Sequence, residues 1–170
     1  MRKFLLTAGV GVAVAIGLAA PAIAATPATF TISAGSLALS APTSSVSLGT
    51  QSASGAPSVI SGLLGTVSVA DDRGGIVGWT ASVISTAFTP PAGPAVPASG
   101  VSYVAGTITH AGAGTFVPAA APNLTGVSPV VVAAGITGVN SASWNPTILV
   151  SVPAALAVGV YTATITHSVA

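Results

Sequence analysis

Short runs in which apolar residues alternate with hydroxyl-bearing or small residues recur along almost the whole chain from residue 29 onward. Side chains two residues apart lie on the same face of a β-strand, so each run predicts a strand with one buried and one solvated face. Val, Ile, Thr and aromatic residues, which favour strands, fill many of these positions. The runs occupy residues 29–33, 36–40, 45–48, 67–69, 79–83, 101–104, 107–110, 130–134, 148–152 and 161–166.

Glycine and proline interrupt the chain too often for long helices. The sequence has 20 glycines and 13 prolines, and no apolar stripe of 3.6-residue period follows residue 24. About eight to ten short strands in one domain must either close a barrel or stack as two sheets. We therefore expect an all-β fold, a single-domain antiparallel β-sandwich of Ig-like or jelly-roll-like type over residues 25–170. Long loops are expected at residues 90–100 and 111–129.

The first 24 residues have the three parts of a secretory signal peptide. Arg2 and Lys3 give a basic start, an apolar run extends from Phe4 to Leu18, and the small-x-small pattern of residues 22–24 precedes Ala25. An uncleaved membrane anchor is the alternative, but the apolar run is shorter than the ~20 residues that span a bilayer. We expect residues 1–24 to be removed and the chain to be exported, which excludes a cytoplasmic partner.

Charge is almost absent once the signal peptide is removed. Asp71, Asp72 and Arg73 are then the only Asp, Glu, Lys or Arg residues, and one arginine against two aspartates leaves a formal side-chain charge of −1. A single arginine cannot form the basic patch that nucleic acid requires, so we expect no nucleic acid partner. The chain also has no cysteine, so stability has to come from packing and sheet hydrogen bonds.

The few titratable residues do not predict an active site. Two histidines without cysteine fall short of a zinc site, and no serine stands in a Gly-x-Ser-x-Gly motif. His110 and His167 each follow a Thr-Ile-Thr triplet, which favours a place at a strand end. We expect no enzyme activity, no metal and no cofactor.

The charged triplet is more economically explained as a structural anchor. The adjacent Asp71 and Asp72 point to opposite faces of an extended chain, which is poor geometry for a catalytic pair. We expect one aspartate to pair with Arg73 or to cap the turn before Trp79.

Four aromatic residues are candidates for either the core or a ligand platform. Trp79 shares a strand face with Ala81 and Val83, and Tyr161 is similarly placed in the last predicted strand, so both are expected to anchor the core. Trp144 stands beside Asn145 and Pro146 at a strand start, and we expect it to be exposed. Together with Tyr103 it is the candidate binding pair, because sugar rings stack on exposed aromatic side chains.

A family resemblance enters through the valine-rich run that ends in Asp71-Asp72-Arg73-Gly74 and continues to Gly78-Trp79-Thr80-Ala81. This segment resembles the first signature of the WxL-type cell-wall-binding domains, with Ala81 in the place of leucine. Residues 28–170 are also similar to small secreted WxL-like surface proteins of actinobacteria, through Val101-Ser102-Tyr103 and Ser143-Trp144-Asn145-Pro146. The resemblance implies a surface β-sandwich that associates with peptidoglycan.

These observations together predict a secreted, non-catalytic surface or binding protein of the cell envelope. Its expected partner is a cell-wall polymer or a surface protein. One alternative is a self-assembling coat or fibre subunit, because uncharged strands offer little resistance to edge-to-edge pairing. Another is a carbohydrate-binding module, which requires Trp144 and Tyr103 to lie on one exposed face.

Overall fold

The computed structural model describes residues 26–170, so the predicted signal peptide and its cleavage site lie outside the described residues. Two units are distinguished, residues 1–32 and 33–170, and every strand of the described chain belongs to the second. All the strand pairs in this unit are antiparallel, and they form a nearly closed barrel or sandwich. The prediction of an all-β antiparallel fold is confirmed.

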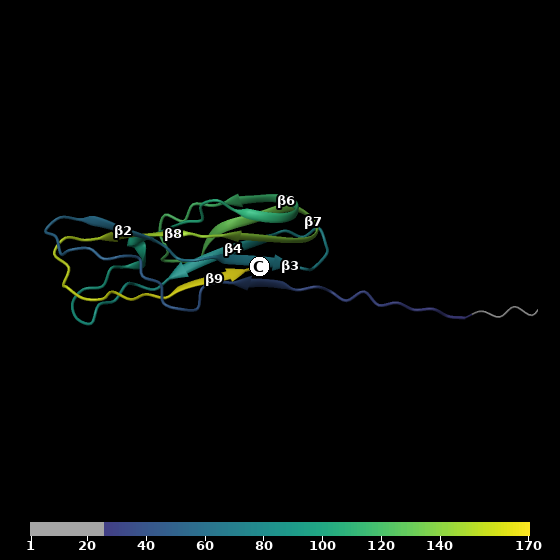
Figure 1. Cartoon of the computed structure of the whole chain (residues 1–170), viewed down its shortest axis with the longest axis horizontal. Helices are drawn as coiled ribbons and strands as arrows, with labels where there is room; N and C mark the ends of the chain where they lie inside the picture. The colour runs from purple at the N-terminus through teal and green to yellow at the C-terminus, as the bar shows by residue number, and fades with distance from the viewer. Residues whose placement is uncertain (1–25) are drawn as a thin grey trace, which may run out of the picture. The chain divides into compact units, whose positions relative to one another are not determined.

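A six-stranded sheet is organised around one long strand, β7 (Ser128–Trp144). Strand β6 (Thr109–Pro118) pairs along one edge of β7. The other edge is divided between β3 (Val67–Asp71), which pairs with residues 140–144, and β4 (Trp79–Ser85), which pairs with residues 128–133. Beyond these lie β1 (Leu37–Ser40), paired with β3, and β9 (Ile165–Val169), paired with β4. Since β1 and β9 also contact each other, the sheet nearly closes (Figure 1).

A smaller sheet has the order β2-β8-β5. Its strands are β2 (Ser58–Leu63), β8 (Thr147–Val152) and β5 (Val101–Val104), and a short 3₁₀ turn at Ala98–Gly100 precedes β5. Only Asn145 and Pro146 separate β7 from β8, so the chain passes directly from the larger sheet into the smaller one (Figure 1).

Glycines allow β7 to serve two neighbours on one edge. Gly135 and Gly138 have positive φ angles of 62° and 76°, a conformation that side chains other than glycine rarely adopt. The strand bends between the part that pairs with β4 and the part that pairs with β3. Its partner β6 has matching register shifts around Gly112 and Gly114.

The core is built from the inward positions of both sheets. Alternate residues are buried along β3 and β4, as the period-two pattern predicts. Each fully buried valine or isoleucine contributes about 1.5–3 kcal/mol relative to an exposed one. The buried hydrophobic residues of these strands and their neighbours include Val67, Val69, Trp79, Ala81, Val83, Val101, Tyr103, Val130, Val131, Trp144, Ile148 and Val150.

Four sequence expectations about strands and loops are wrong. Residues 29–33 and 45–48 form no strand, although they alternate, because alternation creates a strand only where a partner edge is available. The expected loop at 111–129 is shorter, since β6 extends to Pro118 and β7 begins at Ser128, which leaves residues 119–127 between the two strands. The last strand begins at Ile165, not at residue 161.

Candidate functional site

The charged triplet lies where the chain leaves β3 and turns toward β4. Arg73 donates from Nε to Asp71 Oδ1 at 2.8 Å and from a terminal guanidinium nitrogen to Asp71 Oδ2 at 3.0 Å. The same nitrogen also reaches the carbonyl of Gly78 at 3.2 Å. The pairing of one aspartate with Arg73 is therefore present, and it involves Asp71, while Asp72 is exposed.

Asp71 is the buried member of the pair, with 2% of its side chain exposed. Hydrogen bonds from Arg73 lower the pKa of Asp71 from 3.8 to about 2, against the effect of burial, which raises it. The carboxylate therefore stays ionised and acts as a fixed acceptor in the turn. This geometry gives it no proton to exchange near neutral pH.

Asn140 connects this ion pair to the core, and the sequence analysis did not identify it. It stands opposite Asp71 in the β3–β7 pairing and donates from Nδ2 to Asp71 Oδ2 at 3.1 Å. Its Oδ1 accepts the indole N–H of Trp79 at 2.9 Å. An amide is suited to this position because it both donates and accepts. An asparagine between valine and serine in a strand-like run was the only signal available in the sequence.

A second buried network joins the two sheets. Trp144 donates its indole N–H to the hydroxyl oxygen of Tyr103 at 2.7 Å, and that hydroxyl lies 3.2 Å from Nε2 of His167. Because the indole is only a donor, the Tyr103 oxygen accepts from it, and the hydroxyl proton is available to Nε2 when the imidazole carries its hydrogen on Nδ1. Burial raises the pKa of Tyr103 above its ordinary value and lowers the pKa of His167.

The expected aromatic platform for a sugar ring is wrong. Trp144 is only 3% exposed and Tyr103 only 1%, so neither ring offers a face to a ligand. The polar atoms of both side chains are used inside the protein. Alternate residues of β7 are buried up to the end of the strand, and Trp144 is the last of them. Its side chain therefore points into the core, where it contacts Tyr103 of β5.

The other two predicted anchors differ from each other. Trp79 is 2% exposed and holds the start of β4 against β7. Tyr161 is half-buried, lies outside the named strands, and donates its hydroxyl to the carbonyl of Ala157 at 3.0 Å. Tyr161 therefore packs against the edge of the core and closes a local turn.

The outer surface near β6 carries the other histidine. The ring of His110 stacks on that of Phe116, with centroids 4.5 Å apart, and Phe116 in turn contacts Trp79. His110 is exposed and lies in β6, whereas Asp71 ends β3 and His167 lies in β9. These three titratable side chains thus belong to three different strands.

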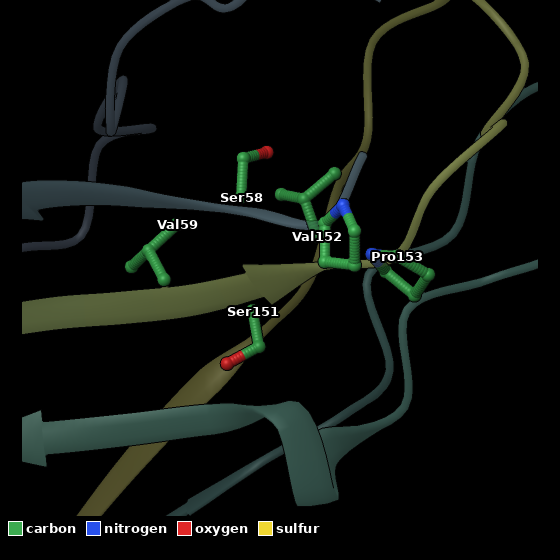
Figure 2. A pocket seen from close by; sticks show the side chains of 6 residues that line it. Ser58, Val59, Ser151, Val152 and Pro153 are labelled. Carbon is green, nitrogen blue, oxygen red and sulfur yellow. The ribbon is translucent and has the colours of Figure 1, made fainter. Parts of the chain in front are cut away.

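Two shallow grooves occur in the described part of the chain. One, of about 330 Å³, crosses β3, β7 and β6 and is lined by small residues together with His110. The other, of about 310 Å³, lies where β2 begins and β8 ends, and Figure 2 shows the side chains around it. Its lining residues are Pro57, Ser58, Val59, Ser151, Val152 and Pro153. Both volumes are at the low end for small-molecule sites.

Within residues 26–170 no group of three or more His, Asp or Glu side chains is placed to hold a metal ion. No helix in the same range is long and apolar enough to cross a bilayer. No protein-family model matches the chain, and neither a curated protein nor a solved structure shows significant similarity to it.

Proposed function

We propose that the chain is a secreted, non-catalytic surface protein of the cell envelope that holds its partner through uncharged contacts. The observation that carries this proposal is the pairing of Arg73 with the buried carboxylate of Asp71. One of the two aspartates is buried, and the arginine is committed to it and to the Gly78 carbonyl. Apart from the exposed Asp72 and His110, the remaining surface of the described chain offers hydroxyl, amide, backbone and apolar groups.

A cell-wall polymer is the partner that the sequence favours. The Asp71–Gly74 and Gly78–Trp79 elements carry the resemblance to WxL-type domains, and both take part in the anchor that fixes the β3–β4 turn. We assign a structural role to the hydrogen bonds among Asp71, Arg73, Asn140 and Trp79. The neighbouring surface of the sheet would contact the wall polymer. Contact through hydroxyl and apolar groups suits an uncharged glycan better than an anionic polymer.

A carbohydrate-binding module that uses Trp144 and Tyr103 is no longer supported, because both are buried. The self-assembling coat or fibre subunit remains the second candidate. It is favoured by the six-residue edge of β2 and by strongly exposed apolar side chains such as Phe30 and Ile32.

The proposal is tested by fractionating producing cells and by sedimenting the purified protein with wall fragments. Raising the salt concentration from 0.1 M to 1 M shortens the Debye length from about 10 Å to 3 Å, which releases proteins held by charge. We expect the bound fraction to stay constant or to rise, because salting-out ions favour apolar burial. Wall fragments stripped of anionic polymer are the control and should bind equally. Release by salt, or recovery only from the cytoplasm, would contradict the proposal.

A further inference from the structure

The segment that precedes β1 has the alternating sequence of a strand but forms no strand in the described structure. Residues 28–33, Ala-Thr-Phe-Thr-Ile-Ser, alternate apolar and hydroxyl side chains, and we call them the N-terminal arm. Phe30 is 87% exposed and Ile32 is 85% exposed. Exposing two large apolar side chains on one face of an unpaired extended segment is unfavourable, and pairing with another sheet edge would bury them.

The arm is rooted firmly in the larger sheet. The carbonyl of Ser36 accepts a hydrogen bond from the amide of Asp72 at 2.8 Å. Gly35 lies so close to the Asp72 carbonyl that a side chain at this position would collide with it. The chain is thus held at residues 35 and 36, immediately after the arm and before β1.

The free edge of β2 is the best acceptor for such a strand. In the described part of the chain, no backbone hydrogen bond joins β2 to any segment except β8, and the β2–β8 register runs without a bulge over six residues. The other edges are less suited. The outer edges of β1 and β9 face each other, since these strands are in contact. On β5, the amide of Tyr103 already donates a hydrogen bond to the Ala121 carbonyl. Strand β6 is irregular, because its register shifts near Gly112 and Gly114.

The side chains along β2 also fit the arm. Val59 and Leu63 are each 57% exposed and lie on the same face of the strand, four residues apart. The groove in Figure 2, lined by Pro57, Val59 and Val152 among others, adjoins the start of this edge. Two apolar side chains that stand two residues apart on an added strand would cover this uncharged strip.

We propose that the N-terminal arm of one copy adds as a strand to the free edge of β2 in a second copy of the chain. The arm is rooted next to β1, which pairs with β3, whereas β2 lies at the other end of the folded unit (Figure 1). A donor at one end and an acceptor at the other join copies head to tail, and such contacts extend into open chains. This inference rests on the proposed surface role and specifies its self-assembling form.

The first experiment measures self-association of the purified mature protein by size-exclusion chromatography with light scattering. We expect the mass of the wild type to rise with concentration and the double variant Phe30→Ser/Ile32→Ser to remain a monomer. Val158→Ser/Val160→Ser is the matched control, because these valines are 84% and 73% exposed and are also two residues apart. The control should assemble like the wild type. A wild type that is monomeric at every concentration, or an arm variant that still assembles, would overturn the proposal.

The second experiment locates the acceptor edge by disulfide trapping, which the cysteine-free sequence permits. Protein carrying Ile32→Cys is mixed under oxidising conditions with protein carrying Val59→Cys or Leu63→Cys. We expect a cross-linked heterodimer with at least one of them and none with Val104→Cys, an exposed position on β5 at the other edge of the same sheet. Equal trapping at Val104 would exclude β2 as the acceptor. A monomeric wild type that still sediments with wall fragments would refute this inference and leave the proposed function standing.

Discussion

Trp144 donates its indole N–H to the hydroxyl of Tyr103 over 2.7 Å, and this buried hydrogen bond joins the six-stranded sheet to the three-stranded sheet. Trp79 makes the equivalent bond to Asn140, 2.9 Å long, within the larger sheet. Both tryptophans thus fill the core with their rings and use the only polar atom of the side chain, the indole nitrogen, to hold a neighbouring strand. In a chain without disulfides, such bonds specify how the strands meet.

Replacing Tyr103 by Phe should destabilise the fold, because the variant leaves the buried indole N–H of Trp144 without an acceptor. We expect the free energy of unfolding to fall by about 1–3 kcal/mol, measured by chemical denaturation. Tyr161→Phe is the matched control, since it removes an exposed hydroxyl that bonds only the Ala157 carbonyl. A loss in Tyr161→Phe as large as that in Tyr103→Phe would contradict this account.

Replacing Arg73 by Ala should leave the buried carboxylate of Asp71 with Asn140 as its only other side-chain partner. We expect a loss of about 2–3 kcal/mol, because a buried charge without its counter-ion retains its desolvation cost. Asp72→Ala provides the control, since Asp72 is exposed and should tolerate the change. An unchanged denaturation midpoint for Arg73→Ala would show that the pair does not anchor the turn.

The close approach of Gly78 to β7 predicts that a larger residue at this position destabilises the fold. A side chain at Gly78 would collide with the backbone carbonyl of Ala133, opposite Trp79 in the β4–β7 pairing. Gly78→Ala should therefore lower the thermal midpoint, with a cost of about 1–3 kcal/mol. Gly126→Ala meets no atom within 4 Å and should be neutral or slightly stabilising. If both variants melt at the same temperature as the wild type, the close approach at Gly78 has no energetic role.

The all-β class could be predicted because the alternation of apolar and polar residues is local in the sequence and corresponds to the alternation of buried and exposed side chains in each strand. The pairing of Arg73 with a neighbouring aspartate could be predicted for the same reason, since the two residues are two positions apart. The position of Trp144 could not, because its partner Tyr103 is 41 residues away and becomes a neighbour only when β5 meets the end of β7.

The bend in β7 explains a second group of errors. Glycines at 112, 114, 135 and 138 interrupt the alternation of β6 and β7, so the sequence indicated a loop where the structure has a long hairpin. Asn140 lies opposite Asp71 only because β3 pairs with the far end of the long strand β7. Because Asn140 and Asp71 are 69 residues apart in the sequence, no local pattern indicates that they form a hydrogen bond.

Burial of His167, whose Nε2 lies 3.2 Å from the Tyr103 hydroxyl, should make the stability of the fold depend on pH. Nε2 of His167 accepts the Tyr103 proton only while the imidazole is neutral, and burial lowers the pKa of His167 below its ordinary value of 6.5. Below pH 6.5 the unfolded chain therefore binds a proton that the folded chain resists. The contribution of neutral His167 to the free energy of unfolding is fully present above pH 6.5. It declines as the pH falls below this value, by at most about 1.4 kcal/mol per pH unit.

The measurement is the free energy of unfolding of the wild type between pH 7.5 and pH 4.5, with His167→Gln as the test variant. Glutamine retains an acceptor for Tyr103 but does not titrate, so the decline below pH 6.5 should be reduced in this variant. Asp71 does not interfere, because its pKa of about 2 and the ordinary value of 3.8 both lie below the range. His110→Gln leaves the Tyr103–His167 bond intact and should keep the wild-type decline. A wild type whose stability is constant across this range, or a His167→Gln profile that matches it, would show that His167 accepts a proton as readily in the folded chain as in the unfolded one.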